Sequence, residues 1–373
     1  MPPFVFVLRI APGNVPVGDH LSPDLEARLN AAKQRLDGVD YEKVARVADS
    51  YRDLRRRLRD MGIPHVSNAW LKMYELMKLF PLVRRDASSV THFDNAALPG
   101  AFIEAVNNYM ALCRPNAVYD WRASSMVPQG AGDNDYLEDI YGLWRRNPER
   151  WLMRRDDPAR SGDVTDPAFV DFLRGHFNHG VDLYTSDAGI SVAGRYNDQE
   201  RLNMKINLGQ ILCGLEVLTK GGSLVTKQYT FFHPFTYTLM VLTAACFEKF
   251  CVAKPASSRP GNSEVYLVGL GYKGHEAAAG IIAHLRRMLP EEPRALLDVV
   301  PSSFMEDVRR AAVEIYGRQI ATLDRNVALV NTVLQHKHMF DQLHAEEDAA
   351  WIKKYLPGPI PDSCQLRSDP SPS

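Results

Sequence analysis

Through the middle of the chain, from about residue 63 to residue 275, short apolar and β-branched runs alternate with longer stretches that have helical spacing. Short runs of this kind, bounded by polar or turn residues, are typical of buried strands. Strands and helices that follow one another in turn predict an α/β fold with a doubly wound, mostly parallel sheet. The predicted strands are SVTHFDNA (89–96), NAVYDWRAS (116–124), VDLYTSDA (181–188), SLVTKQYT (223–230), CVAKP (251–255) and EVYLVGLGY (264–272).

Helices are predicted between these strands, at 102–110, at about 198–219 and at about 236–249. The pair Gly261-Asn262, between the last two strands, is typical of a tight turn. We therefore expect these two strands to form an antiparallel pair at the edge of the sheet.

Both ends of the chain are predicted to be helical additions. Residues 1–62 begin with the apolar run FVFVLRI and continue as two amphipathic helices. Residues 276–356 show helical spacing, and the last stretch, 357–373, is rich in Pro and Ser and is predicted to be a disordered tail. The α/β domain is assigned to residues 63–275.

Two charged segments each leave two readings open. RDLRRRLRD (52–60) is a basic stripe that we interpret as a solvated helix face, with an RNA contact as the alternative. The insertion at 129–164 interleaves Tyr141, Trp144 and Trp151 with arginines, which suits stacking on single-stranded bases or on a methylated guanine. Anchoring of the same aromatic residues in the core is the other reading.

The composition is that of an ordinary soluble protein, with 45% hydrophobic and 24% charged residues. A net charge of −1 gives no overall attraction to nucleic acid, so an RNA contact must come from a local patch. The longest apolar stretch, 237–247, is too short to span a bilayer, and the cysteines show no CxxC pair. His336, His338 and His344 lack partners at ligand spacing and are interpreted as a solvated face. We expect a soluble, intracellular protein without a metal.

The turn after the first predicted strand is a candidate cofactor site. A doubly wound sheet binds nucleotide-like ligands at the carboxyl ends of its strands, and Gly100, preceded by Pro99, lets the backbone approach such a ligand. The next strand is expected to end near Asp120 and Trp121, where a carboxylate can take ribose hydroxyls and an indole can lie on adenine. Lys227 lies at the end of an apolar strand, where a charged group must be paired with an opposite charge or belong to a functional site.

Four local contexts occur together in one known family. They are SNAWLKMYEL around Lys72, VDLYTSDAGIS around Asp187, GGSLVTKQYTFF around Lys227 and KPASSRPGNSEVYLVGL around Glu264. From about residue 63 to 275 the chain resembles the FtsJ-like (RrmJ-type) RNA ribose 2'-O-methyltransferases, and most closely their mRNA-cap branch in eukaryotes and large DNA viruses. LPGAFIEAVNNYM is similar to that branch's APGAFIASLNHYL, and YDWRASSM to its CDWSASTL. The turn departs from the wider family's AAPGG while keeping Pro-Gly.

The resemblance implies a Rossmann-like methyltransferase fold and S-adenosylmethionine as the cofactor. On this reading Lys227 is the general base for a ribose 2'-hydroxyl, Lys72 lowers its pKa, and two carboxylates hold the ammonium groups. The catalytic positions that it implies are Lys72, Asp187, Lys227 and Glu264, and the donor contacts are Gly100, Trp121 and Asp187.

The resulting hypothesis is an mRNA cap (nucleoside-2'-O-)-methyltransferase. Its partners would be the capped 5' end of mRNA and other capping or transcription proteins, with no DNA and no membrane. A ribosomal or transfer RNA 2'-O-methyltransferase and a catalytically silent RNA-binding subunit of a capping assembly are the alternatives. The expected location is the nucleus for a cellular protein, and the host cytoplasm or virion for one from a large DNA virus.

Overall fold

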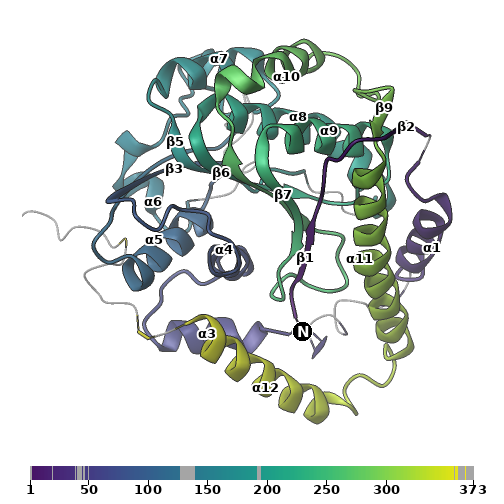
Figure 1. Ribbon diagram of the computed structural model, residues 1–373. Helices are drawn as coiled ribbons and strands as arrows, with labels where there is room; N and C mark the ends of the chain where they lie inside the picture. Colours follow the sequence, from purple (N-terminus) through teal and green to yellow (C-terminus); the bar gives the residue numbers. More distant parts are fainter. Residues whose placement is uncertain are drawn as a thin grey trace, which may run out of the picture.

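A computed structural model describes residues 2–18, 20–37, 39, 44, 47–48, 50–126, 139–190, 195–356, 358–359 and 366. Most of the predicted disordered tail lies outside these residues. A seven-stranded sheet forms the centre of the molecule, in the order β1-β7-β8-β6-β5-β3-β4 (Figure 1). In chain order the strands are β1 (Phe4–Val7), β3 (Ser89–Asn95), β4 (Val118–Ser124), β5 (Val181–Ser186), β6 (Leu218–Gln228), β7 (Phe247–Lys254) and β8 (Val265–Tyr272).

The directions of the strands confirm the predicted fold class, a Rossmann-like and mostly parallel sheet. β4, β3, β5 and β6 run parallel to one another, and β8 lies antiparallel between β6 and β7. The predicted antiparallel pair is β7 with β8. It does not form the edge, however, because β1 pairs with β7 and places Phe4 opposite Lys254.

Helices cover both faces of the sheet and form one apolar core on each side. In the described part of the chain, no helix is both long and apolar enough to cross a membrane. One core includes α1 (Pro23–Gln34), α7 (Pro167–His176), α8 (Gln199–Val217), α9 (Pro234–Ala245), α10 (His275–Met288) and α11 (Ser302–Ala328). The other includes α3 (Arg52–Asp60), α4 (Asn68–Leu79), α5 (Ala101–Cys113) and α12 (Lys337–Tyr355).

The two ends of the chain are not purely helical. Besides β1, the short strands β2 (Asn14–Pro16) and β9 (Val299–Pro301) pair antiparallel and tie the N-terminal segment to the C-terminal region. Three residues are too few to show a periodic pattern, so this pair of strands was not predictable from the sequence. The division of the chain into four regions stays a prediction.

Two predicted solvated faces are partly buried. Arg59 of α3 donates to the carbonyl of Val66 at 3.1 Å, and Arg57 lies 3.8 Å from the buried Asp348 of α12. Part of the basic stripe therefore holds neighbouring elements. The prediction was also wrong for His344, which is 4% exposed because its side of α12 faces inward.

Candidate active site

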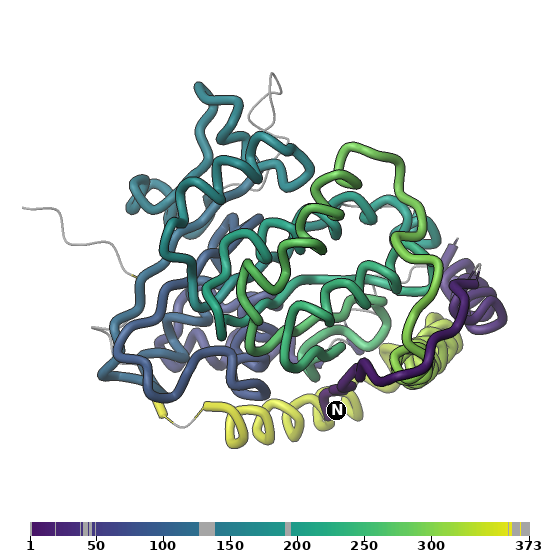
Figure 2. Tube along the Cα trace, turned by 45° about the horizontal axis from the view of Figure 1, so that its top comes forward, coloured from purple at the N-terminus to yellow at the C-terminus, as the bar shows by residue number. Residues whose placement is uncertain are grey.

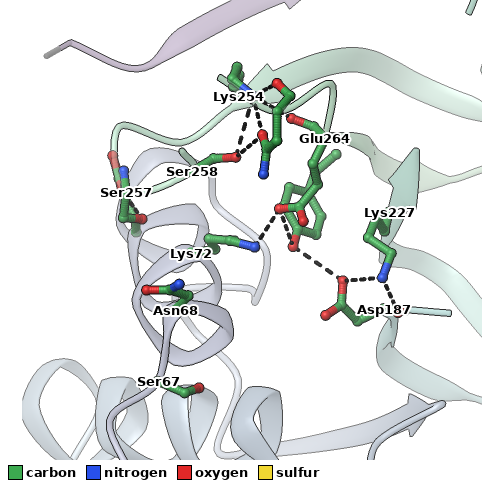
Figure 3. Close-up of polar contacts among 12 residues, drawn as sticks. Ser67, Asn68, Lys72, Asp187, Lys227, Lys254, Ser257, Ser258 and Glu264 are labelled. Carbon is green, nitrogen blue, oxygen red and sulfur yellow. Dashed lines mark hydrogen bonds and ion pairs between the residues drawn. The ribbon is translucent and has the colours of Figure 1, made fainter. Parts of the chain in front are cut away.

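The four predicted catalytic side chains meet at the edge of the sheet where β5 and β6 end. β5 ends at Ser186 and places Asp187 just beyond it, and Lys227 is the penultimate residue of the neighbouring β6. Glu264 directly precedes β8, which runs beside β6 in the opposite direction. Lys72 reaches the same place from α4 (Figure 3).

Each lysine in this group is paired with one carboxylate. Lys72 Nζ lies 2.6 Å from Glu264 Oε1. Lys227 Nζ lies 3.3 Å from Asp187 Oδ1 and donates to the Asp187 carbonyl at 2.6 Å. The Tyr266 hydroxyl lies 3.2 Å from a carboxylate oxygen of Asp187 and 3.2 Å from one of Glu264. A continuous polar chain therefore runs from one lysine to the other (Figure 3).

Burial and pairing decide the protonation of these groups. Burial alone would lower the pKa of Lys227, but Asp187 and other neighbouring groups outweigh it and raise that pKa above its usual value. Burial would raise the pKa of Glu264, but Lys72 and Lys227 hold it at about 2. The prediction that the pKa of Lys227 lies below its usual value is wrong for this arrangement, because the neighbouring acidic groups outweigh burial and the charge of Lys72 is offset by Glu264.

Two further polar residues of the site escaped the sequence reasoning. Tyr266 lies two residues after Glu264 and so shares its face of the strand, which was the available signal. Lys254, the last residue of β7, is 5% exposed and donates to the carbonyls of Asn262 and Glu264 at 2.9 and 2.8 Å. Burial lowers the pKa of Lys254 to about 7. The hydrogen bonds of Lys254 tie the end of β7 to the loop that leads to Glu264.

The predicted donor turn lies at the same edge of the sheet, between β3 and α5. Gly100 has a φ of +106°, in the left-handed region that favours glycine, and no side chain caps α5 at this residue. The first-turn N–H groups are thus left for a ligand or water. A Cβ at Gly100 would lie 2.4 Å from Leu143 Cδ2, so α6 (Leu143–Arg146) of the insertion packs directly on the turn.

Asp120 and Trp121 do not end their strand, contrary to the prediction. β4 continues to Ser124, and the carboxylate of Asp120 is bound by Arg122 and Arg150. Trp121 is 3% exposed. The Arg150 guanidinium lies over the Trp121 ring, with its Cζ 5.1 Å from the ring centre. The apolar and polar alternation of this strand has no break at Trp121, and the strand continues to Ser124, where the predicted range 116–124 also ends. A donor contact by either residue stays a prediction.

The actual end of β4 carries other polar groups. Ser124 Oγ is buried and has no hydrogen-bond partner in the described part of the chain. Gly162 packs against this end, since a Cβ at this position would lie 2.0 Å from the Ser125 carbonyl oxygen. The half-buried Asp163 directly follows Gly162 in the chain. The pair Gly162-Asp163, at the end of the insertion, was the overlooked signal in the sequence.

The aromatic residues of the insertion are mainly structural anchors. Leu143 and Trp151 are 0% and 2% exposed, and Trp144 packs on Trp151. Trp151 also makes a parallel bridge to Ala123 of β4. By contrast, the side chain of Arg145 is 77% exposed. In Figure 2 this lobe stands at the upper left, on the side away from the yellow C-terminal helix. Core anchoring fits the tryptophans, and an RNA contact stays a prediction for the exposed arginine.

Comparisons with known proteins show the family of this chain. The model of the FtsJ-like methyltransferase family matches residues 65–272. The probable methyltransferase EP424R of African swine fever virus (isolate Pig/Kenya/KEN-50/1950) is 37% identical over 312 residues, which cover 79% of this chain and 69% of the viral protein.

A cellular relative and a solved structure are more distant. The cap-specific mRNA (nucleoside-2'-O-)-methyltransferase 2 of Pongo abelii is 29% identical over 82% of this chain, and the match spans 41% of that protein. The crystal structure of human methyltransferase-like protein 13 in complex with SAH aligns with a TM-score of 0.31 at 12% identity, over 61% of this chain and 89% of that chain.

Proposed function

The chain belongs to the FtsJ-like methyltransferase family, and from this premise we propose that it methylates the 2'-hydroxyl of a ribose near the 5' cap of mRNA. The observation that carries the proposal is the pairing of Lys72 with Glu264 and of Lys227 with Asp187 at one edge of the sheet. Support for a capped substrate comes from the relative that is named as a cap-specific mRNA methyltransferase.

S-adenosylmethionine is the methyl donor of this family, and the edge of the sheet offers groups that fit it. The uncapped start of α5, after Pro99 and Gly100, suits the donor's carboxylate. The carboxylate of Asp187, 27% exposed, suits its positive charges. We assign Ser124, at the end of β4, and Asp163, which follows the glycine packed against that end, to the nucleoside part of the donor.

The residues of the two ion pairs have separate roles in methyl transfer. S-adenosylmethionine supplies a methyl group activated by a positively charged sulfur. We assign the general base to Lys227, and the orientation of the 2'-oxygen to Lys72 held by Glu264. Asp187 raises the pKa of Lys227, and a positive charge beside the exposed side of Asp187 has the opposite effect. A larger fraction of Lys227 is therefore unprotonated, and able to accept a proton, when the neighbouring site holds a cation.

Methyl transfer to short RNAs tests the proposal, with the modified nucleotides resolved by mass spectrometry. Capped RNA should acquire a 2'-O-methyl group on a cap-proximal ribose, and the same RNA without a cap should react far more slowly. Equal methylation of uncapped ribosomal or transfer RNA fragments would favour the second enzyme reading. Binding of the donor without methylation of any RNA would favour a silent subunit.

A further inference from the structure

A buried carboxylate outside the catalytic group connects α4 with the loop that carries Glu264. Glu75 lies on α4 one turn after Lys72 and is 0% exposed. Its Oε1 accepts the N–H of Ala256 at 2.8 Å, and its Oε2 accepts the N–H and the hydroxyl of Ser257 at 3.1 and 2.7 Å. These two residues begin the connection from β7 to β8.

The C-terminal helix makes a further contact with the same carboxylate. Tyr355, at the end of α12, donates its hydroxyl to Glu75 Oε1 at 3.1 Å and is 4% exposed. One turn earlier, the ring of Trp351 lies 6.1 Å from that of Tyr74 on α4. α12 lies outside the residues 65–272 that the family model matches. The C-terminal region of this chain nevertheless reaches the catalytic loop.

The loop is held at both ends. Glu75 binds the N–H groups of Ala256 and Ser257 near its start. Lys254 donates to the carbonyl groups of Asn262 and Glu264 near its end (Figure 3). Removal of a buried carboxylate leaves its hydrogen-bond donors unsatisfied, and water cannot easily take its place in a buried site. Because Lys72 and Glu75 share one helix, the contact also fixes α4 relative to Glu264.

We propose that Glu75 is a positioning residue for the Lys72–Glu264 pair. Through the hydrogen bond from Tyr355 to Glu75, the C-terminal helix α12 contributes to the same positioning. The inference rests on the proposed function, since it assumes that this pair serves methyl transfer. A catalytic group displaced by on the order of 1 Å can lose about 10²-fold in rate. The hydrogen bonds of Glu75 prevent such a displacement of Glu264.

Three variants of the full chain test this. In Glu75→Gln one amide N–H₂ would face backbone donors, so kcat should fall at least about tenfold while the Kd for S-adenosylmethionine changes by less than about twofold. Tyr355→Phe removes one hydroxyl and should lower kcat by about twofold to threefold. Glu216→Gln is the matched control, because Glu216 is a buried carboxylate that binds Arg286 at the opposite edge of the sheet. Its kcat should equal that of the wild type.

Two readouts separate positioning from a general loss of stability. Hydrogen exchange of the peptide 254–264 should quicken in Glu75→Gln and Tyr355→Phe but not in the control. The pH at which activity rises should move downward in Glu75→Gln, because a displaced Glu264 no longer raises the pKa of Lys227. A folded Glu75→Gln variant with wild-type kcat and wild-type loop exchange would overturn the proposal.

Each of the remaining outcomes also bears on the positioning role of Glu75. If Glu75→Gln does not fold, Tyr355→Phe carries the test, and an unchanged kcat there overturns the proposal. If donor affinity falls as much as kcat, Glu75 supports the whole site and the positioning role is wrong. If the wild type methylates no capped RNA, the proposed function fails, whereas the loop exchange still shows whether Glu75 and Tyr355 hold this segment.

Discussion

Lys227 and Asp187 form one ion pair, so removal of the lysine leaves a bare carboxylate beside the donor turn. Lys227→Ala should lower the rate of methyl transfer by about 10²–10⁴-fold, the usual contribution of a general base. Donor affinity should be retained or increased, because Asp187 keeps its full negative charge for a cationic ligand. Single-turnover rates and calorimetry with S-adenosylmethionine measure the two effects. Lys220→Ala, an exposed position on the same strand, is the control. A parallel loss of donor affinity would contradict the assignment of Lys227 as base.

The second ion pair tunes the first through charge. A base must be deprotonated to act, so activity is present above the pKa of Lys227 and is lost as the pH falls through it. Glu264 raises that pKa, and Lys72 neutralises Glu264. Lys72→Met should therefore move the rise in kcat to higher pH, and Glu264→Gln should move it to lower pH. Profiles of kcat against pH check both directions. Two profiles that coincide with the wild type would show that the pairs are not coupled.

At the scale of elements, the insertion combines a buried lobe with exposed charge. Trp151 is 2% exposed and extends the edge of β4, whereas the side chain of Arg145 is 77% exposed. Trp151→Ala should lower the free energy of unfolding by about 3–5 kcal/mol, as expected for a buried tryptophan. Arg145→Ala should change the free energy of unfolding by no more than about 0.5 kcal/mol. It should weaken the binding of capped RNA, and this loss of affinity should be smaller at high salt.

Thermal unfolding and RNA titrations at two salt concentrations separate these effects. The two substitutions serve as controls for each other, since they lie in the same lobe and differ in burial. An Arg145→Ala variant that binds RNA like the wild type at low salt would place the RNA contact elsewhere on the surface.

At the scale of the whole molecule, the strands and helices were predictable where their side chains repeat. The runs 89–96 and 223–230 predicted β3 and the second half of β6, because a short buried run bounded by polar or turn residues is visible locally in the sequence. The partner of β1 was not predictable, since Phe4 and Lys254 meet only after the sheet has formed. The range predicted for β4 ends correctly at Ser124, but Asp120 and Trp121 were wrongly assigned to its carboxyl end, because the alternation runs past Trp121 without interruption.

The site was predictable as a set of residues but not as a geometry. Lys72, Asp187, Lys227 and Glu264 were found through their local contexts, and the structure brings all four together. Their pairing was not foreseen, because two lysines and two carboxylates can be matched in more than one way. The buried Glu75 was also missed, since its partners lie in a loop and in the last helix.

The N-terminal segment and α11 are joined at the edge of the sheet by Arg9 and Asp307. Asp307 is 1% exposed and accepts the Arg9 backbone N–H at 3.1 Å and two guanidinium N–H groups at 2.8 Å each. Asp307→Ala should lower the free energy of unfolding by about 1–2 kcal/mol, a range discounted because Arg9 is exposed to solvent. Asp324→Ala, which removes an exposed pair on the same helix, should cost less than about 1 kcal/mol.

The contribution of Asp307 to stability should depend on pH. Burial would raise the pKa of Asp307, but Arg9 outweighs it and lowers that pKa below its usual 3.8. The ionised carboxylate therefore contributes stability above 3.8, and this contribution is lost as the pH falls through the lowered value. Denaturant unfolding of wild type and Asp307→Ala should show a gap at neutral pH that closes in acid. Methyl transfer at low temperature should be equal in the two proteins, because Asp307 does not touch the catalytic group. A gap that persists in acid would mean that packing, and not the carboxylate, holds the N-terminal segment on α11.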